Sequence, residues 1–310
     1  KSMKKVAITG GSGFVGTAIY KECLKRNYEV VLFDRTEPNY QLPKNVKWVQ
    51  CDVVDLKLVT EVTLKENPDE IYLIAGVLGT SELNETPYKA SKNNILGVCT
   101  FMELAVAGKL PPIFYVTKPN VWDNLYTFTK ETSEKIIKYY MEEGIVQGVI
   151  HKWFNAYGEG QHTHPVRKAV PYFILCALHN LPIVIWGNGK QTVDMIYIED
   201  IAYLAVEAMS KESLTNQNVI EIGRGIEITV NQLAKDIIKF TKSNSKIMHK
   251  EMRNGETADT KLVADISGIN NHIHKDFEFY DYEKGLLNTI EYYKNISKEH
   301  LDSFLNFYKL

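Results

Sequence analysis

Cysteine is scarce in this chain, and the spacing of the cysteines present excludes most of the roles that cysteine has in proteins. The four lie far apart among 310 residues, at Cys23, Cys51, Cys99 and Cys176. Zinc and iron–sulfur sites need ligands at short spacings, and a disulfide scaffold needs a high density of cysteine. Neither pattern is present, so we expect no metal centre and predict a reducing, cytoplasmic location.

The sequence also lacks the features of membrane and nucleic-acid-binding proteins. It has no apolar run of membrane length and no signal peptide, and 36 basic against 38 acidic residues give a net charge of −2 without a basic stripe. A hydrophobic content of 45% over this length is sufficient for one large α/β domain, or for a domain with a lobe. We therefore expect neither a membrane nor a nucleic acid as a partner.

What the sequence does contain is a glycine-rich turn near its start, between an apolar run and a helix-like stretch. Gly11, Gly13 and Gly16 fit the spacing G-x-G-x-x-G, and Gly10, Gly13 and Gly16 fit G-x-x-G-x-x-G. Glycine lets the backbone approach a ligand closely, and free N–H groups at a helix start attract an anion. The turn therefore predicts a pyrophosphate-binding site, with a tight turn that binds no ligand as the alternative.

An acidic residue at the end of the next expected strand supports a dinucleotide. Asp34 lies near the spacing at which a carboxylate holds the adenosine ribose hydroxyls. A carboxylate there favours NAD because it repels the 2′-phosphate of NADP, although Arg35 follows directly and softens that preference. The alternative for Asp34 is a simple turn residue. We predict NAD as the cofactor.

Strand-like and helix-like segments alternate through the first half of the chain. The expected strands are 5–9, 29–34, 46–51, 70–74, 113–117 and 146–153, and the expected helices include 17–25, 56–66, 94–107 and 127–143. This alternation predicts an α/β fold with a Rossmann-type doubly wound parallel sheet and ligands beyond the carboxyl ends of its strands. We predict an NAD-binding domain over 3–155, to which 186–220 return, and a smaller C-terminal substrate lobe from 156–185 and 221–310.

A tyrosine and a lysine one helical turn apart can supply the base that a nicotinamide enzyme needs. The ammonium lowers the pKa of the phenol from about 10 and makes the phenolate a usable base. Tyr126 and Lys130 open a long amphipathic stretch just after the fifth expected strand, so we predict this pair as catalytic. The same spacing occurs three more times, at Tyr40/Lys44, Tyr88/Lys92 and Tyr280/Lys284.

The order of these motifs resembles that of the extended short-chain dehydrogenases/reductases that act on nucleotide-activated sugars. This family includes 4-epimerases, 4,6-dehydratases and sugar-nucleotide dehydrogenases. The resemblance covers nearly the whole chain, and its further matching segments are 51–53, 74–76, 94–97, 153–158, 187–191, 196–200 and 253–256.

The resemblance implies NAD, a nucleotide-diphosphate sugar, and a role for each matching position. The catalytic residues would be Tyr126, Lys130, Thr117, Asn94 and Lys118. The cofactor would lie against Gly10, Gly13, Phe14, Val15, Gly16, Asp34, Arg35, Asp52, Val53, Ala75, Gly76, Lys130 and Phe154. The substrate would contact Asn155, Arg253, Arg167, Lys168 and Gln191. Because the family pairs the helices at 94–107 and 127–143 in a two-fold bundle, a homodimer is expected.

The segment before Tyr126 departs from the family pattern. Lys118 stands where the family usually has Ser or Thr, with Thr117 one position earlier. Either Thr117 replaces that hydroxyl after a local shift, or Lys118 lowers the pKa of Tyr126 further or binds substrate; an ordinary surface lysine is the remaining alternative. The 4,6-dehydratases carry an Asp-Glu pair where this chain has Pro119 and Asn120. Neither can exchange a proton, so that mechanism is not expected.

A further departure concerns the charge around a diphosphate. The family often has arginine where this chain has Val193, directly before Asp194. Arg253 resembles another family arginine that suits a bidentate phosphate contact. Arg167 and Lys168 are candidates to replace the missing charge, with a solvated face as their alternative interpretation.

Together these features predict NAD-dependent oxidation of the C4 hydroxyl of a nucleotide-activated sugar to a 4-keto sugar. The altered segment at 117–120 favours net oxidation by a 4-dehydrogenase, and a resemblance to the GDP-heptose 4-dehydrogenases of bacterial capsule biosynthesis points the same way. A 4-epimerase that uses the same 4-keto intermediate is the alternative. A non-catalytic NAD-binding regulator is a third, against which the intact Tyr126, Lys130 and Asn94 argue.

Overall fold

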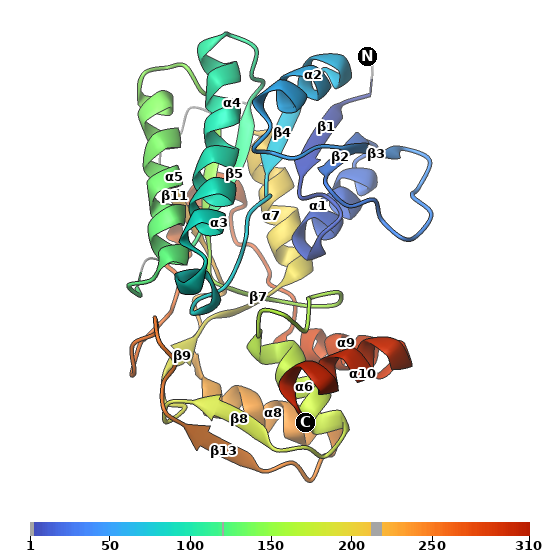
Figure 1. Cartoon of the computed structure of the whole chain (residues 1–310), viewed down its shortest axis with the longest axis vertical. Helices are drawn as coiled ribbons and strands as arrows, with labels where there is room; N and C mark the ends of the chain where they lie inside the picture. The colour runs from blue at the N-terminus through green and yellow to red at the C-terminus, as the bar shows by residue number, and fades with distance from the viewer. Residues whose placement is uncertain (1–2, 120, 212–218) are drawn as a thin grey trace.

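The computed structural model describes residues 3–119, 121–211 and 219–310. Within these, seven parallel strands form the main sheet in the order β11-β6-β5-β4-β1-β2-β3 (Figure 1). Their bounds are β1 Lys5–Thr9, β2 Glu29–Asp34, β3 Val46–Gln50, β4 Glu70–Leu73, β5 Ile113–Thr117, β6 Gly148–Trp153 and β11 Val219–Ile222. The strand order of the dinucleotide-binding Rossmann sheet has its switch point between β1 and β4. The predicted doubly wound parallel fold is confirmed.

Helices cover both faces of this sheet. Their bounds are α1 Phe14–Lys25, α2 Leu56–Glu66, α3 Pro87–Ser91, α4 Gly97–Val106, α5 Leu125–Glu142 and α7 Ile198–Ser210. Successive strand residues point to opposite faces, so Val6 and Ile8 pack with α1 and α7 whereas Ala7 packs with α2, α4 and α5. The near-continuous apolar runs of β1 and β2 follow from burial on both sides.

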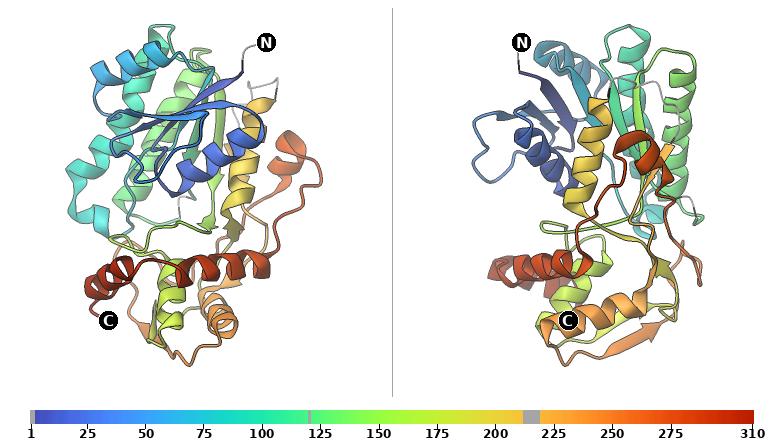
Figure 2. Two further views of the ribbon diagram at one scale, coloured as in Figure 1. Left: turned by 90° about the vertical axis from the view of Figure 1, so that its right-hand side faces the viewer. Right: turned by 180° about the vertical axis from the view of Figure 1, so that it is seen from behind.

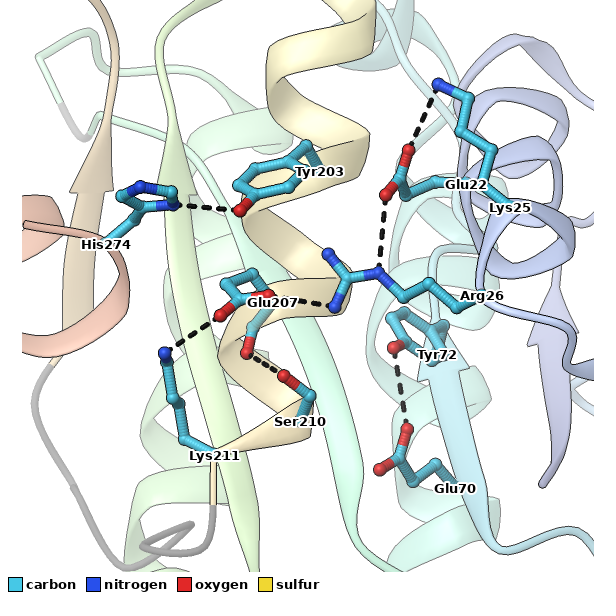
Figure 3. A network of polar contacts seen from close by, with 10 residues as sticks. All are labelled: Glu22, Lys25, Arg26, Glu70, Tyr72, Tyr203, Glu207, Ser210, Lys211 and His274. Atoms are coloured by element: carbon cyan, nitrogen blue, oxygen red, sulfur yellow. Dashed lines mark hydrogen bonds and ion pairs between the residues drawn. The ribbon is translucent and has the colours of Figure 1, made fainter. Parts of the chain in front are cut away.

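A network of ion pairs and hydrogen bonds joins α1 to α7 (Figure 3). The guanidinium of Arg26 donates to Glu207 at 2.9 Å and to Glu22 at 3.3 Å. Beside it, the hydroxyl of Tyr203 and Nδ1 of His274 share a hydrogen bond of 2.8 Å. These contacts hold α7, from the second half of the chain, against the helix that begins at the glycine turn.

Most of the remaining chain forms a smaller lobe at one end of the molecule (Figures 1 and 2), whereas Ile269 and Ile273 pack into the core of the main sheet with residues of α7. It contains α6 Ala169–Leu178, α8 Val230–Thr241, α9 Tyr282–Lys294, α10 Lys298–Tyr308 and the parallel pair β8 Ile183–Trp186 and β13 Ile247–Lys250. Two further pairs are β7 Asn155–Tyr157 with β10 Met195–Tyr197, and β9 Thr192–Val193 with β12 Ile228–Thr229. The boundary predicted at residue 220 falls inside β11, whose last residues Glu221 and Ile222 pair with β6.

Some predicted element bounds shift for local reasons. The helix predicted over 94–107 begins as a π-helical turn, Lys92–Leu96, which widens the backbone around Asn94. The strand predicted from residue 146 begins only at Gly148, whose φ of +152° suits glycine and whose Cβ would overlap the carbonyl oxygen of Ile113. Over the described ranges, no helix combines the length and the apolar character needed to span a bilayer.

Candidate active site

A cavity of about 630 Å³ lies at the carboxyl ends of the parallel strands, where the sheet meets the lobe. It is lined by every residue predicted as catalytic, cofactor-binding or substrate-binding: Gly10, Gly13, Phe14, Val15, Gly16, Asp34, Arg35, Asp52, Val53, Ala75, Gly76, Asn94, Thr117, Lys118, Tyr126, Lys130, Phe154, Asn155, Arg167, Lys168, Gln191 and Arg253. The three competing Tyr-x-x-x-Lys pairs do not line it, and the Tyr88 side chain is 78% exposed. The fold therefore selects Tyr126/Lys130 by position.

The glycine turn at one end of the cavity leaves room that no larger residue would leave. Gly10 has a φ of +65°, and a Cβ on Gly16 would lie 2.5 Å from the carbonyl oxygen of Gly10 and 2.6 Å from the Cα of Gly11. Gly13 caps α1 without a side-chain hydrogen bond, so the first N–H groups of this 12-residue helix keep their capacity for a ligand. These features fit a pyrophosphate, and hence NAD.

Two glycine substitutions should separate packing from ligand approach. A Cβ on Gly13 would meet only the Gly10 carbonyl oxygen, at 3.3 Å, whereas a Cβ on Gly16 collides with backbone. We expect Gly13→Ala to fold normally but to bind NAD about tenfold more weakly, because its methyl group enters the cavity. Gly16→Ala should lower both NAD affinity and Tm. Calorimetric NAD titration and thermal unfolding measure the two effects; NAD affinity unchanged in both variants would contradict the assignment.

The end of the cavity beside β2 carries two carboxylates. Asp34 accepts hydrogen bonds from the backbone N–H groups of Ser12 and Thr36, both at 3.0 Å, and these fix it at the end of β2. Arg35 is exposed and has no ion pair among the described residues. Asp52 accepts from the N–H of Val54 at 3.2 Å. An anchored carboxylate at the end of β2 fits the ribose hydroxyls of NAD.

Side-chain hydrogen bonds shape the turn after β4 that forms the cavity wall. The buried hydroxyl of Thr9 accepts from the N–H groups of Ile74 at 3.0 Å and Ala75 at 3.1 Å. Asn94, in the π-helical turn, accepts from the N–H of Val77 at 2.8 Å and donates to the hydroxyl of Thr129 in α5 at 3.1 Å. Asn94 thus links the cofactor side of the cavity to the helix that carries Tyr126.

Tyr126 and Lys130 lie in the first turns of α5, whose start is fixed by Asn124. The Asn124 side chain accepts from the N–H of Thr127 at 2.8 Å and donates to the carbonyl of Gly255 at 2.8 Å. Among the described residues, the Tyr126 hydroxyl has no hydrogen-bond partner, so it is available to a ligand.

Burial dominates the electrostatics of the Tyr126/Lys130 pair. It raises the pKa of Tyr126, and it lowers the pKa of Lys130 to about 7, where Glu134 opposes and Lys118 reinforces the shift. The expected lowering of the Tyr126 pKa by its lysine is therefore wrong for this structure. The Lys130 ammonium lies 4.4 Å from the centre of the Tyr115 ring. Both members of the pair favour their uncharged forms.

The altered segment before Tyr126 places a hydroxyl and an ammonium on the cavity wall. The buried Thr117 hydroxyl has no hydrogen-bond partner among the described residues. The Lys118 ammonium donates to the carbonyl of Pro119 at 2.7 Å and to the hydroxyl of Thr127 at 2.8 Å. Lys118 is half-buried and lines the cavity, which disfavours the surface-lysine alternative. Asn120 lies outside the described residues.

Cations gather around Trp186 at the lobe side of the cavity. The guanidinium carbons of Arg167 and Arg253 lie 4.0 Å and 4.4 Å from its ring centre. Arg253 is paired with Glu256, and Arg167 donates to the carbonyl of Val184. One nitrogen of Arg253, Nη1, is buried without a hydrogen-bond partner among the described residues, although it lies 4.0 Å from Glu82. Two planar cations on one indole form an anion-binding surface.

The loop that carries Arg167 and Lys168 is held by the C-terminal helix. The hydroxyl of Thr163 shares a hydrogen bond of 2.9 Å with Nε2 of His300, and its carbonyl accepts from the hydroxyl of Tyr308 at 2.9 Å. Burial and neighbouring Arg253 lower the pKa of Lys168 to about 8. Because α10 fixes this loop, the final residues of the chain position cations in the cavity.

Asn155 and Gln191 also line the cavity. The Asn155 side-chain oxygen accepts from the N–H of Asp194 at 3.2 Å. Gln191 donates to the carbonyl of Trp186 at 2.8 Å, while its side-chain oxygen is buried without a partner among the described residues. Asp194 accepts three backbone N–H groups, from Arg224, Gly225 and Ala264, and therefore organises loops.

Sequence reasoning missed several residues of the cavity wall. Trp122, His162, Trp186 and Glu256 line it, and burial, with Lys168 and His164, lowers the pKa of His162 to about 4. The glutamate occurs in the segment 253–256 that the sequence had already marked, so its proximity to Arg253 was a usable signal. No local pattern distinguishes the other three. In the part of the chain that the structure describes, no cluster of His, Cys, Asp and Glu suits a metal.

Comparison with known proteins agrees with the fold and the motifs. The model of the NAD dependent epimerase/dehydratase family matches residues 6–223. The chain is 25% identical to the UDP-N-acetyl-alpha-D-glucosaminuronate decarboxylase of Bacillus cytotoxicus, over 96% of this chain and 99% of that protein. It is 26% identical to a putative UDP-glucose 4-epimerase of Methanocaldococcus jannaschii, over 76% and 81%.

A solved structure supports the same assignment of the fold. An epimerase of Methanothermobacter thermautotrophicus superposes with a TM-score of 0.87 at 23% identity, covering 98% of this chain and 95% of that one. The resemblance found in the motifs and the prediction of an NAD-dependent enzyme are confirmed by the family match. The chain belongs to the NAD dependent epimerase/dehydratase family.

Proposed function

We propose that the protein oxidises the C4 hydroxyl of a nucleotide-diphosphate sugar to a 4-keto sugar, as a 4-dehydrogenase of bacterial surface-polysaccharide biosynthesis. The supporting observation is that one cavity is lined by the Tyr126/Lys130 pair, by the glycine turn at residues 10–16, and by the cations Arg167, Lys168 and Arg253. Bound NAD supplies the hydride acceptor for this chemistry.

Tyr126 is the proposed base. As the phenolate, Tyr126 takes the proton of the sugar hydroxyl and becomes the phenol. The ammonium of Lys130, one turn along α5, stabilises the phenolate before this transfer. The unpartnered hydroxyl of Thr117 is positioned on the same wall to hydrogen-bond the reacting sugar. Asn94 holds α5 in position relative to the proposed NAD site through its hydrogen bond to the hydroxyl of Thr129. This division of roles explains why each polar group lies where it does.

The proposed diphosphate site is the surface around Trp186. Arg253 and Arg167 stack near its indole, and Lys168 adds a third cation from the start of α6. Two buried atoms make no hydrogen bond among the described residues and are suited to ligand contacts: Nη1 of Arg253 and the side-chain oxygen of Gln191. We assign Asn155 to the sugar side, and the cofactor to the wall from Gly10 to Gly76 together with Phe154.

We propose that the lobe formed by 156–185 and 221–310 binds the nucleotide sugar, while 3–155 bind NAD. We also propose a homodimer through α4 and α5, because Leu96, Val106, Phe128 and Tyr139 on and beside these helices are exposed.

Lys118 stands where the family usually has Ser or Thr, and this replacement favours net oxidation over epimerisation. An epimerase must return the hydride to the opposite face of the keto sugar, which requires the sugar to turn over in the site. The fixed ammonium of Lys118 disfavours that turn by adding an oriented contact beside Tyr126. The 4-epimerase remains the second candidate, supported by the putative 4-epimerase among the relatives.

Product analysis tests this proposal. Purified protein is incubated with excess NAD and, separately, with UDP-, dTDP- and GDP-hexoses. We expect absorbance at 340 nm to rise in proportion to a 4-keto sugar observed by NMR. A C4 epimer without net absorbance change would establish the epimerase instead. If neither product forms in any series, the enzymatic proposal is contradicted.

A further inference from the structure

Lys118, beside the proposed base Tyr126, is positioned to bind a ligand. The Lys118 ammonium is held by the carbonyl of Pro119 and the hydroxyl of Thr127, at 2.7 Å and 2.8 Å. It lies 5.5 Å from the centre of the Tyr126 ring and 5.9 Å from that of Trp122. An ammonium has three donors. Two of them fix its position, and the third has no partner among the described residues, which leaves it for a ligand. The side chain is half-buried on the cavity wall.

Among the residues that the structure describes, no carboxylate forms an ion pair with the Lys118 ammonium. Over the described ranges, no acidic group lies within ion-pair distance of Lys118, Lys130 or Lys168. The carboxylate that lines this end of the cavity, Glu256, is already paired with Arg253. Burial, Lys168 and Lys152 lower the pKa of Lys118 to about 8, because the ammonium is partly removed from water and repelled by two neighbouring cations. A bound anion would remove this cost.

The diphosphate does not account for Lys118. Arg167 and Arg253 lie against Trp186, and Lys168 interacts with Arg253, so these three cations are sufficient for two phosphate charges. Lys118 instead lies beside Tyr126, at the reacting end of the proposed sugar site. A ligand anion that meets Lys118 would therefore lie on the sugar.

We propose that the substrate is a nucleotide-diphosphate sugar bearing a carboxylate, an acidic sugar of the uronate kind, and that Lys118 binds this carboxylate. This inference rests on the proposed function, because it assumes that a nucleotide sugar occupies the cavity. The free N–H of Lys118 donates to a carboxylate oxygen, and the contacts to Pro119 and Thr127 hold the ammonium in place before binding. Lys118 thereby sets both the substrate class and the orientation of the sugar against Tyr126.

Matched ligand pairs test the inference by calorimetry on the NAD-loaded protein. The pairs are UDP-glucose with UDP-glucuronate, dTDP-glucose with dTDP-glucuronate, and GDP-mannose with GDP-mannuronate, alongside free UDP, dTDP and GDP. For the base that binds, the acidic sugar should bind about 10- to 100-fold more tightly than the neutral one, as a charge-assisted hydrogen bond allows. Lys118→Met should abolish this preference while leaving the affinity for the free nucleotide diphosphate and the Tm unchanged.

The matched control is Lys190→Met, which removes an exposed lysine from a neighbouring loop and should retain the preference. If no nucleotide diphosphate binds, the proposed function itself fails. Equal binding of acidic and neutral sugars, with the nucleotide bound, overturns only the carboxylate inference. The carboxylate inference is also overturned if Lys118→Met lowers kcat for both sugars equally without changing their relative affinities.

Discussion

Replacing Tyr126 with phenylalanine is expected to lower kcat by about 10²- to 10⁴-fold, the usual contribution of a positioned general base. The change removes one oxygen and keeps the ring. Among the described residues, that oxygen makes no hydrogen bond, so neither the start of α5 nor the cavity wall depends on it. NAD affinity and Tm should therefore stay close to their original values, and steady-state kinetics with the accepted nucleotide sugar measure the loss.

The chain provides its own control for this substitution. Tyr88 has a lysine at the same spacing, Lys92, whose ammonium lies 5.9 Å from the Tyr88 ring centre, yet the tyrosine is exposed and away from the cavity. Tyr88→Phe should leave kcat unchanged. Substantial activity in Tyr126→Phe would contradict the assignment of Tyr126 as the base. Equal losses of kcat in both variants would show that the effect is indirect.

The pH dependence of kcat should also depend on Tyr126. Because burial raises the pKa of Tyr126, little phenolate exists at pH 7, and kcat should rise with pH until Tyr126 has lost its proton in the loaded site. That rise should be absent from the residual activity of Tyr126→Phe. Loss of the Lys130 charge above its pKa of about 7 works in the opposite direction, which limits the rise.

The parts of the site that could be predicted from the sequence are those whose function requires a local pattern. The glycine turn needs small residues at fixed spacing, because a Cβ on Gly16 would meet the Gly10 backbone. Asp34 follows a buried strand, and Tyr126 with Lys130 needs one helical turn. In each case the constraint acts within a few residues of the chain, so composition and periodicity reveal it.

The parts that could not be predicted depend on contacts between distant segments. Trp186 brings Arg167 and Arg253 together from positions 86 residues apart, and only the pairing of β8 with β13 creates that surface. The direction of the Tyr126 pKa shift was also wrong from sequence. A lysine at i+4 suggests a lowered pKa, but the cavity that surrounds both side chains makes burial the larger effect.

The second large effect is expected on the pH dependence of stability. It comes from a histidine buried in the core of the sheet, outside the cavity. His151 lies in the middle of β6 between Val149 and Trp153, is fully buried, and packs edge-on against Phe114 at 4.8 Å. Neither ring nitrogen has a hydrogen-bond partner among the described residues. Burial lowers the pKa of His151 to about 3. The folded state therefore requires the neutral ring, whereas the unfolded chain binds a proton below a pKa of about 6.5.

Because the pKa of His151 is lower in the folded than in the unfolded state, stability is fully present above pH 6.5 and is lost as the pH falls toward 3. This single group should remove about 2 kcal/mol of unfolding free energy by pH 5 and roughly 4 to 5 kcal/mol at the acid limit. Urea unfolding of the protein and of His151→Leu between pH 5 and 8 measures the difference. The leucine variant should be about 1 to 3 kcal/mol more stable at pH 7, since it removes two unpaired polar atoms.

The variant His151→Gln separates the two causes. Glutamine keeps polar atoms in the core but cannot titrate, so it should lose the acid dependence of His151 without gaining the stability of the leucine variant at pH 7. Other groups that titrate in this range, such as His162 and Asp200, are common to all three proteins and cancel in the comparison. If the wild type and both variants show parallel stability curves from pH 8 to 5, then His151 does not carry the linkage, and water or another donor must reach its ring in the folded state.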